Sequence, residues 1–198
     1  MMRRLAALTT LCALTVLAAG CGSGPASRFY TLNSPAAPAA GAPSNLSVSV
    51  GPVSIPGSVD RPQIVVSTGA NQLALDEFNR WASPLQTDIA RAVAENLTAL
   101  LGATRVSQFP QTLSVDADFR VMIEVQRFES TLGESATLDA VWAVRRSKDG
   151  KSETGRTKVR ESVGQNGYDA LVAAHSRAVA RMSQDIADVV RTLSRPGQ

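Results

Sequence analysis

Side chains that could perform acid–base or nucleophilic chemistry are few in this sequence. His175 is the single histidine, and it is therefore the one candidate of its type for a general base. It falls among apolar residues at helical spacing, which favours a structural residue on the core face of a helix. Two acidic pairs, Asp116/Asp118 and Asp76/Glu77, could each bring two carboxylates together as acid and base. We expect both pairs to be solvated acids at strand ends.

No catalytic motif accompanies these residues. The sequence has no Gly-x-Ser-x-Gly elbow, no Walker loop and no Gly-x-Gly-x-x-Gly pattern. One histidine and two cysteines are too few for the usual zinc site. We expect a protein that is not an enzyme and holds no cofactor or metal. Asn45 and Asn96 begin glycosylation tripeptides, but we discount both, because the leader is bacterial in type and Asn96 falls in an expected helix.

The N-terminus carries the one reactive residue whose role is clear from its neighbours. A short basic start precedes the uncharged stretch 5–19, which is too short for a membrane span and typical of a signal peptide. Small residues then lead to Cys21, a pattern that resembles the bacterial lipobox. We expect a signal peptide over 1–20 and acylation of Cys21, the alternative being an ordinary secretory signal. Cys12 would leave with the peptide, so acylation explains an otherwise unpaired exported thiol.

Charge and composition exclude several classes of protein. The chain has 20 basic and 17 acidic residues, and loss of Arg3 and Arg4 with the signal peptide would leave 18 basic residues, a net charge of +1. Such a balance excludes an electrostatic footprint for nucleic acid. Hydrophobic residues make up 44% of the chain, which excludes disorder throughout.

By resemblance to the lipoprotein sorting rule, Gly22 rather than Asp after the cysteine points to the outer membrane, facing the periplasm.

Residues 21–45 are expected to form a lipidated tether. Most of this segment is Pro, Ala, Gly and Ser, which cannot build a core. Arg28–Leu32 differs, because Phe, Tyr and Leu are poorly placed in a free linker, and we expect a short strand docked on the domain. Docking would leave about six residues, or roughly 20 Å, between Cys21 and the domain. Without docking the reach to residue 45 is about 80 Å.

Residues 46–198 are expected to form a single domain. Apolar residues at helical spacing predict helices over 84–101 and 168–193. Alternating apolar residues predict strands, with a bulge at Gly51-Pro52, over 46–55, 63–67, 71–75, 116–126, 136–144 and 153–163. The order of elements predicts an α+β two-layer sandwich, in which two amphipathic helices cover one face of a mainly antiparallel sheet.

Three segments carry a resemblance to a known family. They are Asp-Arg-Pro-Gln-Ile-Val at 60–65, Arg-Trp-Ala-Ser-Pro-Leu at 80–85 and Tyr-Thr-Leu at 30–32. With them the chain resembles the ABC-type transport auxiliary lipoprotein family, which includes paraquat-inducible protein C. The resemblance implies an outer-membrane lipoprotein that works with an inner-membrane complex and an MCE-domain protein. That partner forms a tunnel for lipids across the periplasm, whose distal end the lipoprotein would hold, as a ring-shaped homo-oligomer.

Three residues within these segments are candidates for an interface. Asp60 and Arg61 could contact a partner or pair locally beside the strand entry at Pro62. Trp81 could anchor an interface, because tryptophan is enriched there, but it also fits a core position before a helix. Trp142 lies on an alternating strand face and is expected in the core.

Two other functions remain open at this point. A lipoprotein activator of a cell-wall synthase would also be α+β and tethered, and a long extended tether would favour it. An exported hydrolase would lose its activity, but not its fold, on mutation of His175 or Asp116.

Overall fold

The computed structural model describes residues 25–38, 44–110 and 117–195. The expected signal peptide, Cys21 and Asp116 lie outside these ranges. Along the chain the elements are β1 (Arg28–Tyr30), β2 (Ser44–Ser54), β3 (Gln63–Gly69), β4 (Gln72–Trp81), α2 (Leu85–Leu101), β5 (Ala103–Gln108), β6 (Phe119–Thr131), β7 (Ser135–Arg146), β8 (Ser152–Ser162) and α3 (Tyr168–Ser194).

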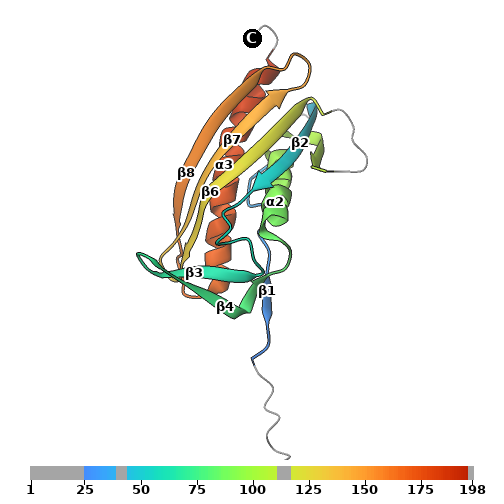
Figure 1. Ribbon diagram of the computed structural model, residues 1–198. Coiled ribbons are helices and arrows are strands. Elements are labelled where there is room, and N and C mark those ends of the chain that lie inside the picture. The colour runs from blue at the N-terminus through green and yellow to red at the C-terminus, as the bar shows by residue number, and fades with distance from the viewer. Residues whose placement is uncertain (1–24, 39–43, 111–116, 196–198) are drawn as a thin grey trace, which may run out of the picture.

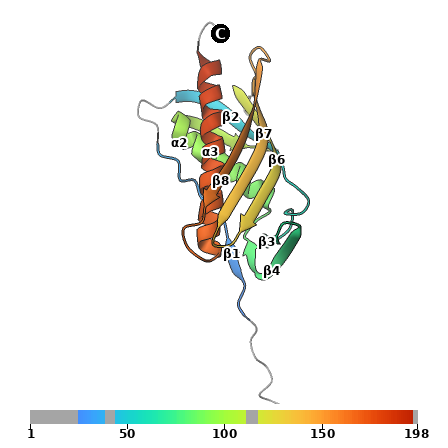
Figure 2. The ribbon, with the colours of Figure 1, turned by 90° about the vertical axis from the view of Figure 1, so that its left-hand side faces the viewer.

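The strands form two sheets. The larger has the order β5-β2-β6-β7-β8, in which β2 is parallel to both neighbours and the remaining pairs are antiparallel. The smaller has the order β1-β4-β3. Both helices lie on one face of the larger sheet (Figures 1 and 2). The expected α+β fold is thus confirmed, but the strands form two mixed sheets rather than one mainly antiparallel sheet. The small sheet lies at the end where β1 enters, opposite to the C-terminus (Figure 1).

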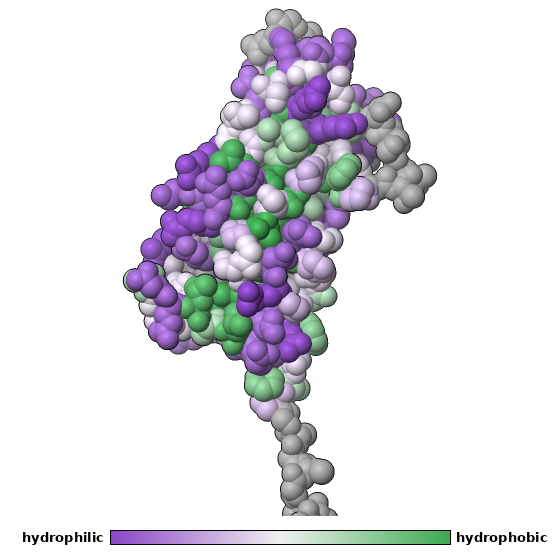
Figure 3. All heavy atoms as spheres, viewed as in Figure 1, coloured by the Kyte–Doolittle hydropathy of each residue, from purple (hydrophilic) through white to green (hydrophobic). Residues whose placement is uncertain are grey.

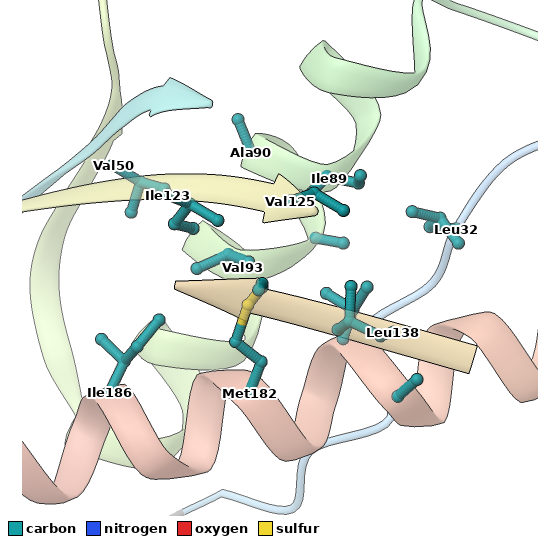
Figure 4. Close-up of a cluster of buried hydrophobic side chains, with 14 of the residues drawn as sticks. Leu32, Val50, Ile89, Ala90, Val93, Ile123, Val125, Leu138, Met182 and Ile186 are labelled. Atoms are coloured by element: carbon teal, nitrogen blue, oxygen red, sulfur yellow. The ribbon is translucent and has the colours of Figure 1, made fainter. Parts of the chain in front are cut away.

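The core lies between the larger sheet and the helices. On β6 the buried residues Phe119, Val121, Ile123 and Val125 alternate with exposed ones, as a strand with one solvated face requires. Ile89 and Val93 of α2 and Met182 and Ile186 of α3 pack against this face (Figure 4). Burial of each large apolar side chain contributes about 1.5–3 kcal/mol relative to exposure.

Three features of the backbone bear on the sequence expectations. The bulge expected at Gly51-Pro52 is present, as a register shift between Val50 and Val53 in the β2–β6 pair. Strand β5 was not expected, because Ala-Thr-Arg-Val-Ser-Gln has no apolar alternation, and it forms by pairing parallel to β2. Strand β4 runs on to Trp81 through an irregular stretch at 76–79. Among the described residues, no helix is both long and apolar enough to span a membrane.

Candidate functional site

The N-terminal strap, which we define as residues 28–36, is docked on the folded part of the chain. Its first part is β1, the strand expected at 28–32, and it pairs parallel with β4. The amide of Ala82 donates to the carbonyl oxygen of Tyr30 at 2.8 Å, and the Tyr30 hydroxyl donates to Asn79 Oδ1 at 2.8 Å. The first part of the strap is therefore an edge strand that pairs with β4 and is also held by the Tyr30 side chain and by the amide of Ala82, just after β4.

A buried carboxylate holds the next part of the strap. Asp88 in the first turn of α2 is 1% exposed. Its oxygens accept hydrogen bonds from the Thr31 hydroxyl at 2.9 Å and from the Leu32 amide at 2.7 Å. Arg91 Nη2 donates to Asp88 Oδ1 at 2.7 Å and also to the carbonyl oxygen of Leu32. Leu32 is itself 1% exposed, so the strap becomes part of the core at this residue.

Two further hydrogen bonds tie the strap to both helices. The Asn33 amide donates to Ser176 Oγ of α3 at 3.1 Å, and the Ala36 amide donates to Asn96 Oδ1 of α2 at 3.2 Å. Ser176 and Asn96 are both buried. The side chain of Asn96 is thus a structural acceptor and is closed to glycosylation. The strap is fixed at three successive levels, on β4, on Asp88 and across the helices.

These anchoring residues were missed in the sequence. Asp88, Asn96 and Ser176 are polar residues on helix faces that are otherwise buried and apolar. The available signal was their position within the 3.6-residue period of each helix, where burial demands a partner. The partner of Asp88 could not be predicted from the sequence, because the amide that donates a hydrogen bond to it lies 56 residues away in the chain.

His175 is a buried structural residue with no access to substrate. Its ring stacks on Phe128, with centroids 4.0 Å apart and planes 10° apart, and its Nε2 lies 2.8 Å from Ser130 Oγ. Burial lowers the pKa of His175 to about 3, so the ring is neutral near pH 7. Its Nδ1 has no partner among the described residues. A histidine sealed in this way stabilises the packing of α3 on β6 and cannot act as a general base.

Asp118 and Asp76 each hold part of the fold, and Asp116, the expected partner of Asp118, lies outside the described residues. Asp118 accepts hydrogen bonds from the Ser47 amide at 2.8 Å and hydroxyl at 2.6 Å. Those bonds hold the pKa of Asp118 below its usual value, although burial opposes them. Asp76 accepts from the amides of Phe78 and Asn79 and so stabilises the irregular part of β4. No group of three potential metal ligands is present in the described part of the chain.

The expected interface residues divide between surface and core. Asp60 and Arg61 are exposed in the loop between β2 and β3 and form no ion pair with another described residue. Trp81 is buried and lies edge-on to Phe128, with centroids 6.2 Å apart. Trp142 is in the core as expected, and its Nε1 donates to Thr157 Oγ1 at 3.0 Å. An interface role for Asp60, Arg61 and Trp81 stays a prediction that a single chain does not test.

Comparisons with known proteins give the fold and the family. The chain is similar to a crystal structure of an uncharacterised protein, with TM-score 0.69 and 20% identity over 84% of this chain and 99% of that one. It is similar also to a Xanthomonas campestris protein of the DUF330 family, with TM-score 0.67 and 18% identity over 83% of this chain and 94% of that one. No curated protein matches the sequence.

The family follows from the sequence match rather than from these folds. The model of a family described as the ABC-type transport auxiliary lipoprotein component matches residues 30–187. This match begins within the strap and runs into α3, so it includes the anchoring residues Asp88, Asn96 and Ser176. The chain therefore belongs to the ABC-type transport auxiliary lipoprotein component family.

Proposed function

We propose that this protein is a non-enzymatic accessory component of an MCE/ABC-type lipid transport system. In this proposal the signal peptide is removed, Cys21 is acylated, and the protein faces the periplasm from the outer membrane. As a homo-oligomeric ring it holds the distal end of an MCE-domain tunnel. Membership of the transport auxiliary family supports the transport role.

The docking of the strap is the observation that carries the proposal. Because the strap is fixed from Arg28 onward, only the six residues 22–27 separate Cys21 from the domain. Six residues span at most about 20 Å. A domain held so close to its anchor suits a part that fixes a tunnel at the membrane. It does not suit an activator that must reach a synthase through the cell-wall layer.

The chemistry of the described residues agrees with a role without catalysis. His175 is sealed in the core, and Asp118 and Asp76 hold backbone and side-chain donors of the fold. These structural roles favour an accessory protein over a hydrolase that would use the same residues.

Lengthening the tether tests the proposal. We would insert fifteen Gly and Ser residues after Ser27, which adds about 50 Å of reach and leaves the strap intact. The readouts in cells are resistance to detergent, as a measure of membrane integrity, and crosslinking to the MCE-domain protein. We expect the insertion to reduce both, because the domain would no longer be held at the membrane.

The matched control is the same insertion after Gly164, in an exposed loop where an added Cβ meets no atom within 4 Å. This variant should retain both readouts. Full function of the tether insertion would contradict the proposal. Crosslinking of that variant to a peptidoglycan synthase instead would support the activator function.

A further inference from the structure

Apolar side chains are exposed on β1 and β4 of the small sheet. Seven large hydrophobic residues of the described chain are exposed, and four of them belong to β1 and β4. They are Phe29 at 65%, Leu73 at 53%, Leu75 at 45% and Phe78 at 43% exposure. We call these four residues the end patch. Apolar residues gathered in this way on a small sheet mark an interaction surface.

The register of the small sheet places most of the end patch on one face. Phe29 is paired with Arg80, which is paired in turn with Gln63. Leu75 is paired with Val65, and Leu73 with Ser67. Residues 63, 65 and 67 alternate along β3 and share a face, so Phe29, Leu75 and Leu73 share it too. Phe78 is exposed in the irregular stretch of β4, two residues before Arg80.

The end patch lies toward the N-terminal end of the described chain. The small sheet forms the end of the molecule where β1 begins (Figure 1), and apolar side chains gather over it on the surface (Figure 3). The opposite end carries the polar β7–β8 turn at 147–151. Phe29 follows Cys21 by eight residues, so the chain permits at most about 28 Å between the acylated cysteine and the patch.

We propose that the end patch inserts into the lipid surface that holds the anchor. This inference rests on the proposed acylation of Cys21. Aromatic and aliphatic side chains are favoured at the boundary between headgroups and acyl chains, and binding there scales with the apolar area that is buried. Arg28, exposed at the start of β1, would lie beside anionic headgroups. The patch and the acyl chains together fix how the domain stands on the membrane.

Fluorescent labels at single cysteines test the inference on the full acylated protein. The mature chain would have no free thiol once Cys21 is acylated, so Phe29→Cys, Leu73→Cys and Phe78→Cys each provide one labelling site. Their exposure makes these substitutions compatible with folding. The control is Lys148→Cys, exposed in the turn at the opposite end. Each labelled protein is reconstituted into vesicles of phosphatidylethanolamine and phosphatidylglycerol.

We expect the emission of labels at residues 29, 73 and 78 to shift to shorter wavelength on vesicles. We expect its intensity to fall by at least half when the lipid tails carry nitroxide quenchers. The label at residue 148 should behave as in water. The inference is wrong if all four labels report water. It is also wrong if the patch labels shift without quenching by the tails, since a second copy or another protein then covers the patch. Mass spectrometry of each preparation separates these results from failure of the proposed function, because a chain without acyl groups refutes the anchor itself.

Discussion

Replacement of Asp88 by alanine should release the N-terminal strap. The carboxylate of Asp88 accepts hydrogen bonds from the amide of Leu32 and the hydroxyl of Thr31, and it forms an ion pair with Arg91 at 2.7 Å. Alanine would leave the Leu32 amide buried without an acceptor. It would also leave Arg91 without its partner in the first turn of α2.

The expected loss of stability is about 3 kcal/mol. A buried donor left without an acceptor costs about 1–3 kcal/mol. The Thr31 bond to a charged acceptor adds about 1.5 kcal/mol. We count the Arg91 pair at no more than about 0.5 kcal/mol, because the side chain of Arg91 is 31% exposed. About 3 kcal/mol corresponds to a more than hundredfold fall in the ratio of docked to undocked strap.

Glu95→Ala is the matched control. Glu95 lies on the same helix and pairs with the same arginine at 2.7 Å, but its side chain is 44% exposed. Removal of an exposed pair of this kind costs at most about 0.5 kcal/mol. Urea unfolding gives the two free energies of unfolding. Hydrogen exchange of the amides of Leu32, Asn33 and Ala36 reports the strap directly.

The reasoning would be refuted by either of two results. One is a free energy of unfolding for Asp88→Ala within 0.5 kcal/mol (about the value for an exposed pair) of that for Glu95→Ala. The other is unchanged protection of the strap amides in Asp88→Ala, which would mean that the strap is held without the carboxylate.

Three other predictions concern the core and the anchor. Gly155→Ala should destabilise by about 1–3 kcal/mol in urea unfolding, because its Cβ would lie 2.3 Å from Trp142 Cζ2, whereas Gly164→Ala should be neutral. The pKa of His175 is about 3 in the folded protein and near 6.5 in the unfolded chain. The free energy of unfolding should therefore be unaffected by this group above about pH 6.5 and should fall by up to about 1.4 kcal/mol per pH unit from there toward pH 3. His175→Gln should lack this part of the pH dependence, and equal slopes of unfolding free energy against pH in the two proteins would contradict the prediction. Cys21→Ala should abolish acylation, so that mass spectrometry finds no acyl groups on the N-terminal peptide and the protein is no longer processed as a lipoprotein.

The sequence predicts those parts of the fold that depend on local periodicity. Alternation along β6 and helical spacing in α2 and α3 indicated the sheet and its two covering helices. The Gly51-Pro52 interruption indicated a bulge that the register confirms. Such features follow from residues that are neighbours in the chain, and they are therefore visible in it.

Features that depend on distant partners were not visible. Strand β5 has little pattern of its own and exists because β2 lies beside it. Asp88 looks like an ordinary acidic residue in the first turn of a helix, and its role appears only when the strap lies against it. A docked strand within 28–32 was predictable, because Phe29 and Tyr30 are unlike the Pro- and Ala-rich residues around them, and the structure places it at Arg28–Tyr30. What it docks on was not predictable.

Crosslinking in living cells, followed by isolation of the protein from membranes, tests the central claim most directly. Wild type and Cys21→Ala would be compared at equal amounts of folded protein. The account predicts that wild type recovers further copies of itself and an MCE-domain protein, and that Cys21→Ala loses the MCE-domain protein. Recovery of a peptidoglycan synthase with no MCE-domain protein would contradict the account and favour the activator function.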